Sequence, residues 1–146
     1  MTPYETPDPV MDVDALEAFM AVAFPQVGAD GKVFTFTDVE PGLARLAFTP
    51  IDRHLRPGGT VSGPAMFTLA DLAAYGVIIA HIGDVALAVT TNLNINFLRK
   101  PKPGPLFGLA RLIKLGKRLA VVDIAITDEH DALVAHATST YSLPPR

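Results

Sequence analysis

Asp71 is the residue of this sequence whose setting most clearly indicates chemistry. It is the only carboxylate in a long apolar segment, TVSGPAMFTLADLAAYGVIIAHIG, which runs from Thr60 to Gly83. Burying an ionised carboxylate without partners is costly, so a sequence shaped by stability alone would carry Leu or Ala here. Asp71 is therefore either satisfied by a structural donor or placed in a cleft, where it acts as a base or attacks a substrate directly.

The start of the same segment supplies a second chemical element. Gly63-Pro64 places a proline where helices commonly begin, and the free N–H groups of the first turn, with that of Gly63, then point out of the positive end of the helix. Such an end stabilises a developing oxyanion, although a plain helix start capped by Ser62 or Gly63 fits the local sequence equally well. Together with Asp71, it predicts an acyl group lying over the first turns of the helix, with its carbonyl beside both residues.

Periodicity predicts the elements that position these residues. A buried central helix is expected over Pro64–Ile82, because Asp71 argues against a membrane span of this length. Alternating polar and apolar residues and turn signals predict the remaining elements. These are a short helix from Asp12 or Asp14 to Pro25, a hairpin of Lys32–Val39 and Leu43–Pro50, and strands Ala86–Phe97, Leu106–Leu115, Leu119–Thr127 and Leu133–Leu143. The order predicts an α+β domain in which an antiparallel meander wraps around the long helix.

Composition limits the classes of function. The chain has 146 residues, of which 49% are hydrophobic and 18% charged, so we expect one domain over residues 12–146 after a loose Pro-rich arm at 1–11. This apolar content also favours an oligomer. The net charge of −3 is unlike that of a nucleic-acid-binding protein, and no nucleic acid or membrane partner is predicted. The absence of cysteine excludes thiolate chemistry and fits the cytoplasm, as does the acidic N-terminus.

The motifs resemble a known family. GGTVSGPAMFTLADLAA, TTNLNINFLRKPKPG and LIKLGKRLAVVDIAITDEHDALVAHATSTYSL are similar to segments of the hotdog-fold acyl-CoA thioesterases of the phenylacetate-degradation (PaaI) type. The resemblance runs from about Gly31 to Leu143. It implies that Gly63 donates its N–H to the thioester carbonyl and that Asp71 is the base or nucleophile. It also implies active sites between two subunits, in a homodimer or dimer of dimers.

The sequence departs from that family at three positions. Ser62 stands where the family usually has a histidine that helps to position substrate or water. Arg56 replaces a common Asn or Gln of the preceding loop, where an arginine either pairs with an acidic group of the substrate or forms a surface salt bridge. Tyr75 replaces a Ser or Thr one turn after the acid, and either donates to water, Asp71 or the acyl group, or has a structural partner.

Further candidates follow from residue type. His54 precedes the helix and is predicted to reach the cleft, whereas His81, His130 and His136 are scattered without metal-ligand spacing, so no metal is predicted. Ser62 lacks the G-x-S-x-G setting of a serine hydrolase. The amides of Asn92, Asn94 and Asn96 project from one strand face. They are either solvated or hydrogen-bonded to a partner subunit or to the amides of a pantetheine arm.

Basic residues are concentrated around two consecutive turns. Six of the chain's 12 Lys and Arg lie there. They are Arg99, Lys100, Lys102, Lys114, Lys117 and Arg118. A solvated pair of strand ends explains them simply, but in an acidic chain they also suit the phosphates of coenzyme A. Arg99, Lys100, Lys117 and Arg118 are predicted to bind coenzyme A.

The sequence thus predicts hydrolysis of an acyl-CoA thioester to a free acid and CoA, without a cofactor. Asp71, Gly63 and Ser62 form the predicted catalytic set, and His54, Arg56, Tyr75, Asn94 and Asn96 the substrate-binding set. The alternative is an acyl-CoA-binding or regulatory hotdog protein with little turnover, which the missing histidine favours. A hotdog hydratase or dehydratase is a third possibility, against which the same absence counts.

Overall fold

A computed structural model of the chain describes residues 6–83 and 86–146. The first helix, α1, spans Val13–Ala23, and its N-cap is Asp12, whose carboxylate accepts the Ala15 N–H at 2.8 Å. A short 3₁₀ turn, η1, follows at Pro25–Gly28. The predicted arm lies partly outside the described residues, but the N–H groups of Val10 and Met11 both donate to the carbonyl of Ala80.

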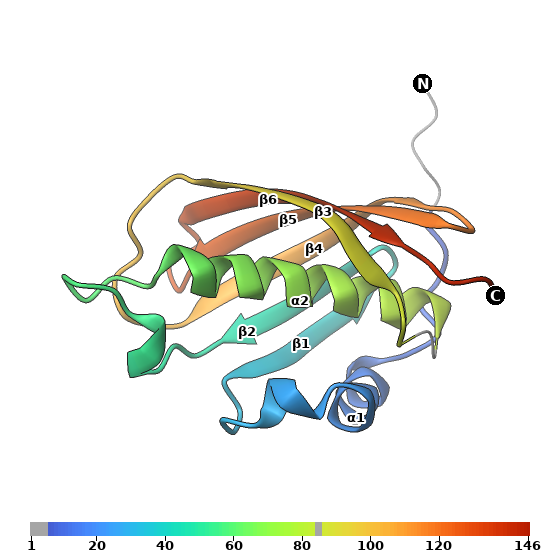
Figure 1. The fold of residues 1–146 in the computed structure, drawn as a ribbon, viewed down its shortest axis with the longest axis horizontal. Coiled ribbons are helices and arrows are strands. Elements are labelled where there is room, and N and C mark those ends of the chain that lie inside the picture. Colours follow the sequence, from blue (N-terminus) through green and yellow to red (C-terminus); the bar gives the residue numbers. More distant parts are fainter. Residues whose placement is uncertain (1–5, 84–85) are drawn as a thin grey trace.

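Six strands form one antiparallel sheet in the order β1-β2-β4-β5-β6-β3 (Figure 1). The strands are β1 (Phe34–Glu40), β2 (Leu43–Phe48), β3 (Val89–Phe97), β4 (Leu106–Leu115), β5 (Leu119–Asp128) and β6 (Leu133–Ser142). The predicted strands all form, each with bounds within a few residues of those expected. The loop before the long helix also contains a 3₁₀ turn, η2, at Asp52–His54.

The predicted four-stranded meander is wrong in one respect. β4, β5 and β6 are consecutive neighbours, but β3 pairs with β6 at the edge of the sheet rather than with β4. β4 instead lies between β2 and β5. The segment 98–105 therefore returns the chain from one edge to the middle of the sheet. Sequence neighbours are only usually spatial neighbours, so strand order could not be read from strand spacing.

The long helix α2, Gly63–Ile82, lies against the concave face of the sheet (Figure 1). It is long and apolar enough to cross a membrane, but 78% of its most apolar stretch is buried inside the fold. The helix sits so close to β1 that a side chain at Gly76 would occupy the space of the Phe36 ring. It ends at Gly83, whose φ of 88° suits glycine and whose N–H donates to the Ile79 carbonyl. This arrangement is the hotdog fold, as predicted.

Candidate functional site

Asp71 is held from one side only. Its Oδ1 accepts hydrogen bonds from Thr90 Oγ1 at 2.7 Å and from Tyr141 Oη at 2.6 Å. Oδ2 accepts no hydrogen bond from residues 6–83 or 86–146. Every fully buried polar side-chain atom in these ranges has a hydrogen-bond partner, so Oδ2 is not fully buried. Oδ2 is therefore open to its surroundings. A carboxylate with one oxygen fixed and the other accessible is equipped to take a proton from water or to attack an electrophile.

The open oxygen belongs to a pocket with mostly apolar walls. The pocket has a volume of about 590 Å³ and lies between α2, the end of α1 and the start of β3. Among its lining residues are Phe24, Phe67, Leu72, Tyr75 and Val89. Apolar walls lower the local dielectric constant, which strengthens the electrostatic interactions of a carboxylate, and they suit the hydrocarbon part of a substrate.

A β-bulge brings the two donors to Asp71. Thr90 and Tyr141 are cross-strand partners, and the β3–β6 register shifts between Thr90 and Asn92. Strict alternation would place Thr90 on the same face as Asn92, which is the face away from α2. The bulge reverses this for Thr90 and turns its hydroxyl toward the helix. Neither Thr90 nor Tyr141 was predicted as a site residue, because nothing in the strand pattern marks the bulge or the pairing.

Tyr75 lies one helical turn beyond Asp71 and also lines this pocket. Its hydroxyl donates to the carbonyl of Ala86 at 3.0 Å, and its ring packs edge-on against Phe24 with centroids 5.9 Å apart. The Ala86 carbonyl is therefore a structural partner of the Tyr75 hydroxyl, which was one of the alternatives considered for this residue from the sequence. The ring remains available as an apolar wall, and its predicted contact with substrate stays a prediction.

The start of α2 presents one amide without an acceptor. Ser62 is the N-cap: its Oγ accepts the Ala65 N–H and its carbonyl accepts the Met66 N–H, both at 3.2 Å. Pro64 has no N–H. Of the first-turn donors, this leaves the Gly63 N–H, for which no acceptor is recorded among the described residues. The sequence-predicted oxyanion donor is thus free to bind a ligand, while the Ser62 hydroxyl is occupied as a cap.

Glycine at position 63 also fits its surroundings. A Cβ there would lie 3.3 Å from the ring of Phe97, closer than most side-chain contacts. Gly63 and Phe97 line a pocket of about 520 Å³ together with Pro64, Phe67, Thr68 and Ile95. Because Phe67 and Thr68 also line the Asp71 pocket, the two pockets adjoin along α2 and β3.

Basic side chains stand at the far end of this path. Arg56, Arg99 and Lys100 line a third pocket, of about 540 Å³, which shares Gly63 and Phe97 with the second. We call the three adjoining pockets the α2–β3 groove. The groove thus runs from the Asp71 carboxylate, past the Gly63 amide, to a cationic end. Guanidinium and ammonium groups at such an end suit phosphate groups.

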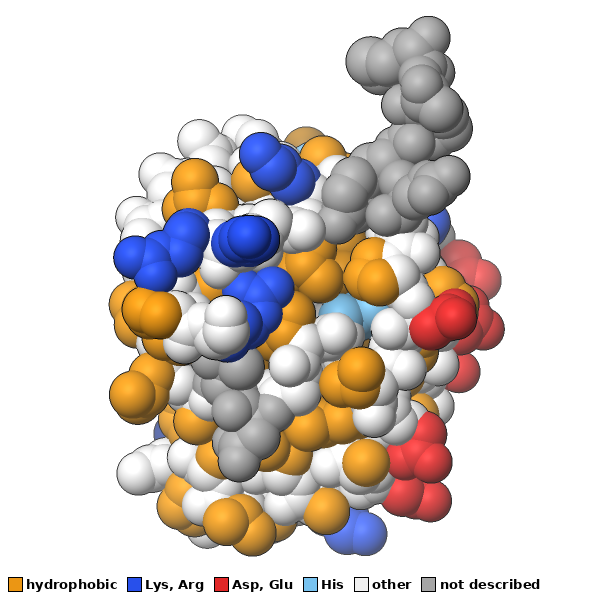
Figure 2. Space-filling view, turned by 90° about the vertical axis from the view of Figure 1, so that its right-hand side faces the viewer, with side chains coloured by type: hydrophobic (Ala, Val, Ile, Leu, Met, Phe, Trp, Pro, Cys, Tyr) orange, Lys and Arg blue, Asp and Glu red, His pale blue; other side chains and the backbone are white. Residues whose placement is uncertain are grey.

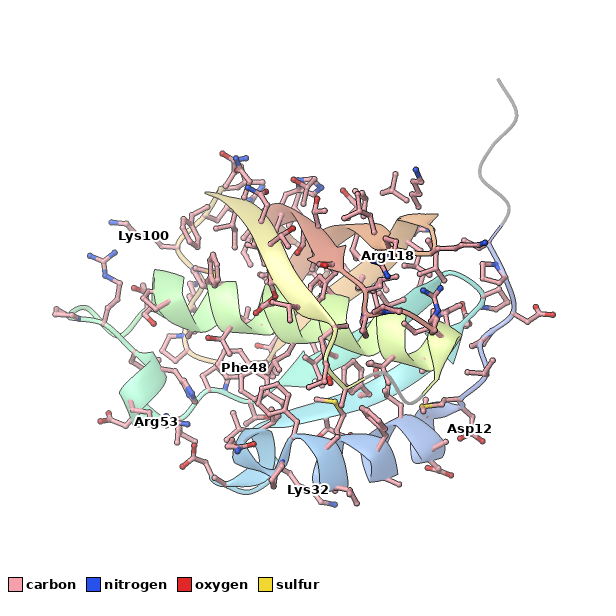
Figure 3. The ribbon with its side chains drawn as sticks, turned by 45° about the vertical axis from the view of Figure 1, so that its right-hand side comes forward. Asp12, Lys32, Phe48, Arg53, Lys100 and Arg118 are labelled. Atoms are coloured by element: carbon pink, nitrogen blue, oxygen red, sulfur yellow. The ribbon has the colours of Figure 1, made fainter. Side chains whose placement is uncertain are left out.

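The other two predicted CoA-binding residues lie elsewhere in the chain. Arg118 and Lys117 occupy the β4–β5 turn, and Figure 3 shows Lys100 at the left edge of the molecule and Arg118 well to the right of it. Leu119, next to this turn, pairs with Ser142, and Ser142 pairs with Val89 at the start of β3. The turn therefore lies near the start of β3, whereas Arg99 follows the end of β3. The two groups are therefore separated by roughly the length of β3, about 25 Å. Figure 2 shows the end of the molecule that carries the C-terminus of α2. Most basic side chains gather at the upper left of this view, and acidic side chains lie along its right edge.

His54 is turned into the fold. It is 8% exposed, its Nδ1 accepts the Ile51 N–H at 2.9 Å, and its ring packs edge-on against Phe48. Burial lowers the pKa of His54 below its ordinary value, and the charge of the neighbouring Arg53 acts in the same direction. Its carbonyl accepts the Ser62 N–H at 2.8 Å. His54 therefore lines none of the three pockets of the groove, but it ties the preceding loop to the start of α2.

Asn94 and Asn96 lie on the sheet face opposite α2. They pair with Thr138 and His136, whereas Leu93, Ile95 and Phe97 share the inner face with the buried residues of β6. All three asparagines do share one face, as predicted. That face is not the one that carries the Asp71 pocket, so in one protomer their amides are directed away from the α2–β3 groove. A contact with substrate would have to come from a second subunit.

The histidines do not form a metal site. Burial lowers the pKa of His81, whose Nε2 accepts the Gly42 N–H at 2.8 Å. His136 lies 2.5 Å from Asp123 on the outer sheet face, and His130 is exposed in a turn. Across residues 6–83 and 86–146, no three His, Asp or Glu side chains are grouped so that they could hold a metal ion.

Gly63 and Asp71 are not brought together within one protomer. They are eight residues apart on α2, which at about 1.5 Å per residue corresponds to about 12 Å along the helix axis. Asp71 lines the first pocket and Gly63 the second and third. A single thioester carbonyl is too small to contact both residues easily at hydrogen-bonding distance.

Comparison with known proteins gives the family of this chain. Residues 58–135, more than half of the chain, match the family model described as the thioesterase superfamily. The chain belongs to the thioesterase superfamily. This match includes α2, with Gly63 and Asp71, and the strands from β3 to the start of β6.

Individual relatives agree. A crystal structure of a proposed thioesterase from Silicibacter sp. TM1040 superposes with a TM-score of 0.88 at 46% identity, covering 99% of this chain and 100% of that one. A protein from Streptococcus mutans UA159, solved bound to acetyl CoA, gives a TM-score of 0.70 at 30% identity over 77% of this chain and 90% of its own. A proposed esterase from Saccharolobus solfataricus is 38% identical over 73% of this chain and 70% of its own length. The narrower PaaI-type assignment stays a proposal.

Proposed function

We propose that the protein hydrolyses an acyl-CoA thioester to the free acid and CoA. The observation that carries the proposal is the Asp71 carboxylate, with Oδ1 fixed by two hydroxyls and Oδ2 open to a mostly apolar pocket. Thioesterase superfamily membership and the acetyl-CoA-bound relative support the reaction class and the carrier. The mostly apolar pocket at Asp71 suits an acyl group, and Arg56, Arg99 and Lys100 at the other end of the groove suit the phosphates of coenzyme A.

In the reaction, the oxygen of water bonds to the thioester carbon and the carbon–sulfur bond breaks. Asp71 Oδ2 accepts the proton of the water and then passes it to the departing CoA sulfur. The alternative is attack by Oδ2 itself, which forms an anhydride that water then opens. A single turnover in ¹⁸O-water, with enzyme in excess, separates general-base catalysis from an anhydride that water opens at the aspartyl carbon. General-base catalysis places ¹⁸O in the released acid, whereas such an anhydride places it in the Asp71 carboxylate.

We further propose that each active site combines Asp71 of one subunit with Gly63 of another. The distance of about 12 Å along α2 supports this, because a carbonyl beside Asp71 needs an oxyanion donor nearer than its own Gly63. A two-fold axis would bring the amide of a second copy to the carboxylate of the first, and would do so twice. This proposal includes a relationship of the protein to the PaaI-type thioesterases and its assembly as a dimer or a dimer of dimers.

Heterodimers of two inactive variants test the shared site. Asp71→Asn removes the base, and Gly63→Pro removes the amide while keeping a residue suited to the first helical turn. With shared sites, a heterodimer of the two regains one intact site and about half of the wild-type activity per dimer. With both residues acting in one chain, every site contains a defect and the heterodimer stays inactive. Differently tagged subunits, coexpressed and purified through both tags, provide the sample, and the two homodimers are the controls.

A binding protein with little turnover is the second candidate. The observation in its favour is Ser62, which stands at the position of the family's usual histidine and whose hydroxyl is engaged with the Ala65 N–H. Measuring CoA release and acyl-CoA affinity on one purified sample distinguishes the candidates. Micromolar binding without release of CoA would replace the hydrolase proposal.

A further inference from the structure

Tyr141 makes the closest contact with Asp71. It lies near the end of β6, is 2% exposed, and its hydroxyl oxygen is 2.6 Å from Asp71 Oδ1 and 3.0 Å from the carbonyl oxygen of the same residue. A phenol has one proton, so the shorter contact to the charged oxygen is the principal hydrogen bond. The contact to the carbonyl fixes the hydroxyl relative to the helix backbone as well as to the side chain.

The hydroxyl of Tyr141 is a permanent donor. Burial, followed by the negative charge of Asp71, raises the pKa of Tyr141 well above its ordinary value. The phenol therefore stays protonated near neutral pH, where it donates to Asp71 and does not compete with it as a base. Its ring packs against that of Tyr75, with centroids 6.4 Å apart, which restricts its movement.

Two donors on one oxygen restrict the rotation of the carboxylate. Tyr141 from β6 and Thr90 from β3 both bind Oδ1, so a partial rotation of the carboxylate away from this orientation breaks both hydrogen bonds. The same contacts leave Oδ2 on the pocket side. Hydrogen bonds to a charged oxygen are stronger than those to a neutral one, so both donors hold the carboxylate firmly.

We propose that Tyr141 is a positioning residue, which fixes the Asp71 carboxylate so that Oδ2 faces the pocket as the reacting oxygen. This rests on the proposed function of Asp71. A purely structural Tyr141 would contribute packing and a satisfied hydroxyl, but its removal would leave the pH dependence of catalysis unchanged.

Tyr141→Phe is the direct test, because it keeps the ring and removes only the hydroxyl. At pH 7 we expect kcat to fall about 10- to 100-fold with KM within about twofold, since the base is misplaced while the substrate pocket is intact. The acid limb of the kcat profile should move to higher pH by about one unit, because the carboxylate loses a donor that stabilises its charged form.

Ser139→Ala is the matched control. Ser139 lies two residues away on β6, is 1% exposed, and its hydroxyl donates to the Asn92 carbonyl at 3.0 Å without contacting Asp71. The Ser139→Ala substitution therefore removes a buried hydroxyl from the same strand. We expect its pH profile to match that of the wild type. A Tyr141→Phe profile that matches the wild type in both kcat and pH would overturn the proposal.

A measurement without substrate separates this proposal from the proposed function. Carboxyl ¹³C titration of Asp71, assigned by comparison with Asp71→Asn, should show a midpoint at higher pH in Tyr141→Phe than in the wild type. Wild-type protein that hydrolyses no acyl-CoA refutes the proposed function, while an unchanged titration midpoint refutes the role of Tyr141. If Tyr141→Phe does not fold, site-specific 3-fluorotyrosine at position 141, a more acidic donor, should move the midpoint to lower pH, and no movement again refutes the role.

Discussion

The two ends of the α2–β3 groove are built in different ways. At the start of α2, the Gly63 amide is left free by its immediate neighbours, since Ser62 takes the Ala65 and Met66 N–H groups and Pro64 has none. At the carboxylate end, Asp71 is oriented by Thr90 and Tyr141, which are 19 and 70 residues away in the sequence. One end depends on helix capping, and the other on the pairing of two strands.

This difference determines how each end responds to substitution. A helix cap is a local device, and its loss weakens the helix start by a modest amount without displacing distant groups. The hydrogen bonds to Asp71 require the β3–β6 register and the bulge at Thr90, so their geometry depends on the whole sheet. We therefore expect substitutions at the carboxylate end to affect catalysis by disturbing the geometry of Asp71. Substitutions at the helix start should act locally, on helix stability through the Ser62 cap or on catalysis through the Gly63 amide.

Asp71→Asn should have the largest effect of the single substitutions. The amide keeps an oxygen that accepts from Tyr141 and Thr90 but loses the basic oxygen, so kcat should fall by about 10²- to 10⁴-fold. Release of CoA from a panel of acyl-CoAs measures this. The thermal unfolding midpoint should stay close to that of the wild type, which shows that the fold is kept. Turnover equal to the wild type would contradict the assignment of Asp71.

The two basic groups provide the next comparison. Substituting Arg99 and Lys100 together by alanine should raise KM about three- to tenfold with little change in kcat, because exposed charge contacts are each worth about 0.2–1 kcal/mol. The effect should shrink at high salt, where such contacts are screened. The measurement is KM for one acyl-CoA at low and high ionic strength.

Lys117→Ala with Arg118→Ala is the matched double variant. Within one protomer these residues are about the length of β3 away from Arg99, so the cationic end of the groove should be intact. An unchanged KM assigns the coenzyme A phosphates to the end of the groove that carries Arg99 and Lys100, and not to Lys117 and Arg118. An equal rise in KM for both double variants would instead indicate that a second subunit brings Lys117 and Arg118 to the same ligand.

The sequence was sufficient for the elements and for the residues with local signals. Apolar periodicity located α2, and its Gly63-Pro64 start and Gly83 end agree with the structure. The alternation of Asn92, Asn94 and Asn96 predicted their common face. It could not predict which face, because that depends on the pairing of β3 with β6 rather than with β4. Thr90 was missed for a related reason, since the bulge that turns it toward Asp71 exists only in the paired sheet.

Ser62→Ala should have the smallest effect on kcat of these substitutions. It also distinguishes a capping role of the Ser62 hydroxyl from a catalytic one. If the Ser62 hydroxyl serves only as the N-cap, losing its bond to the Ala65 N–H should lower the free energy of unfolding by about 1 kcal/mol and change kcat by less than about threefold. If the hydroxyl instead replaces the family's histidine in catalysis, kcat should fall much further. Ser62→Asp separates the roles again, because aspartate caps a helix well but adds a negative charge beside the Gly63 amide. That variant should retain stability and lose turnover, since the added charge opposes the oxyanion that the amide is proposed to stabilise.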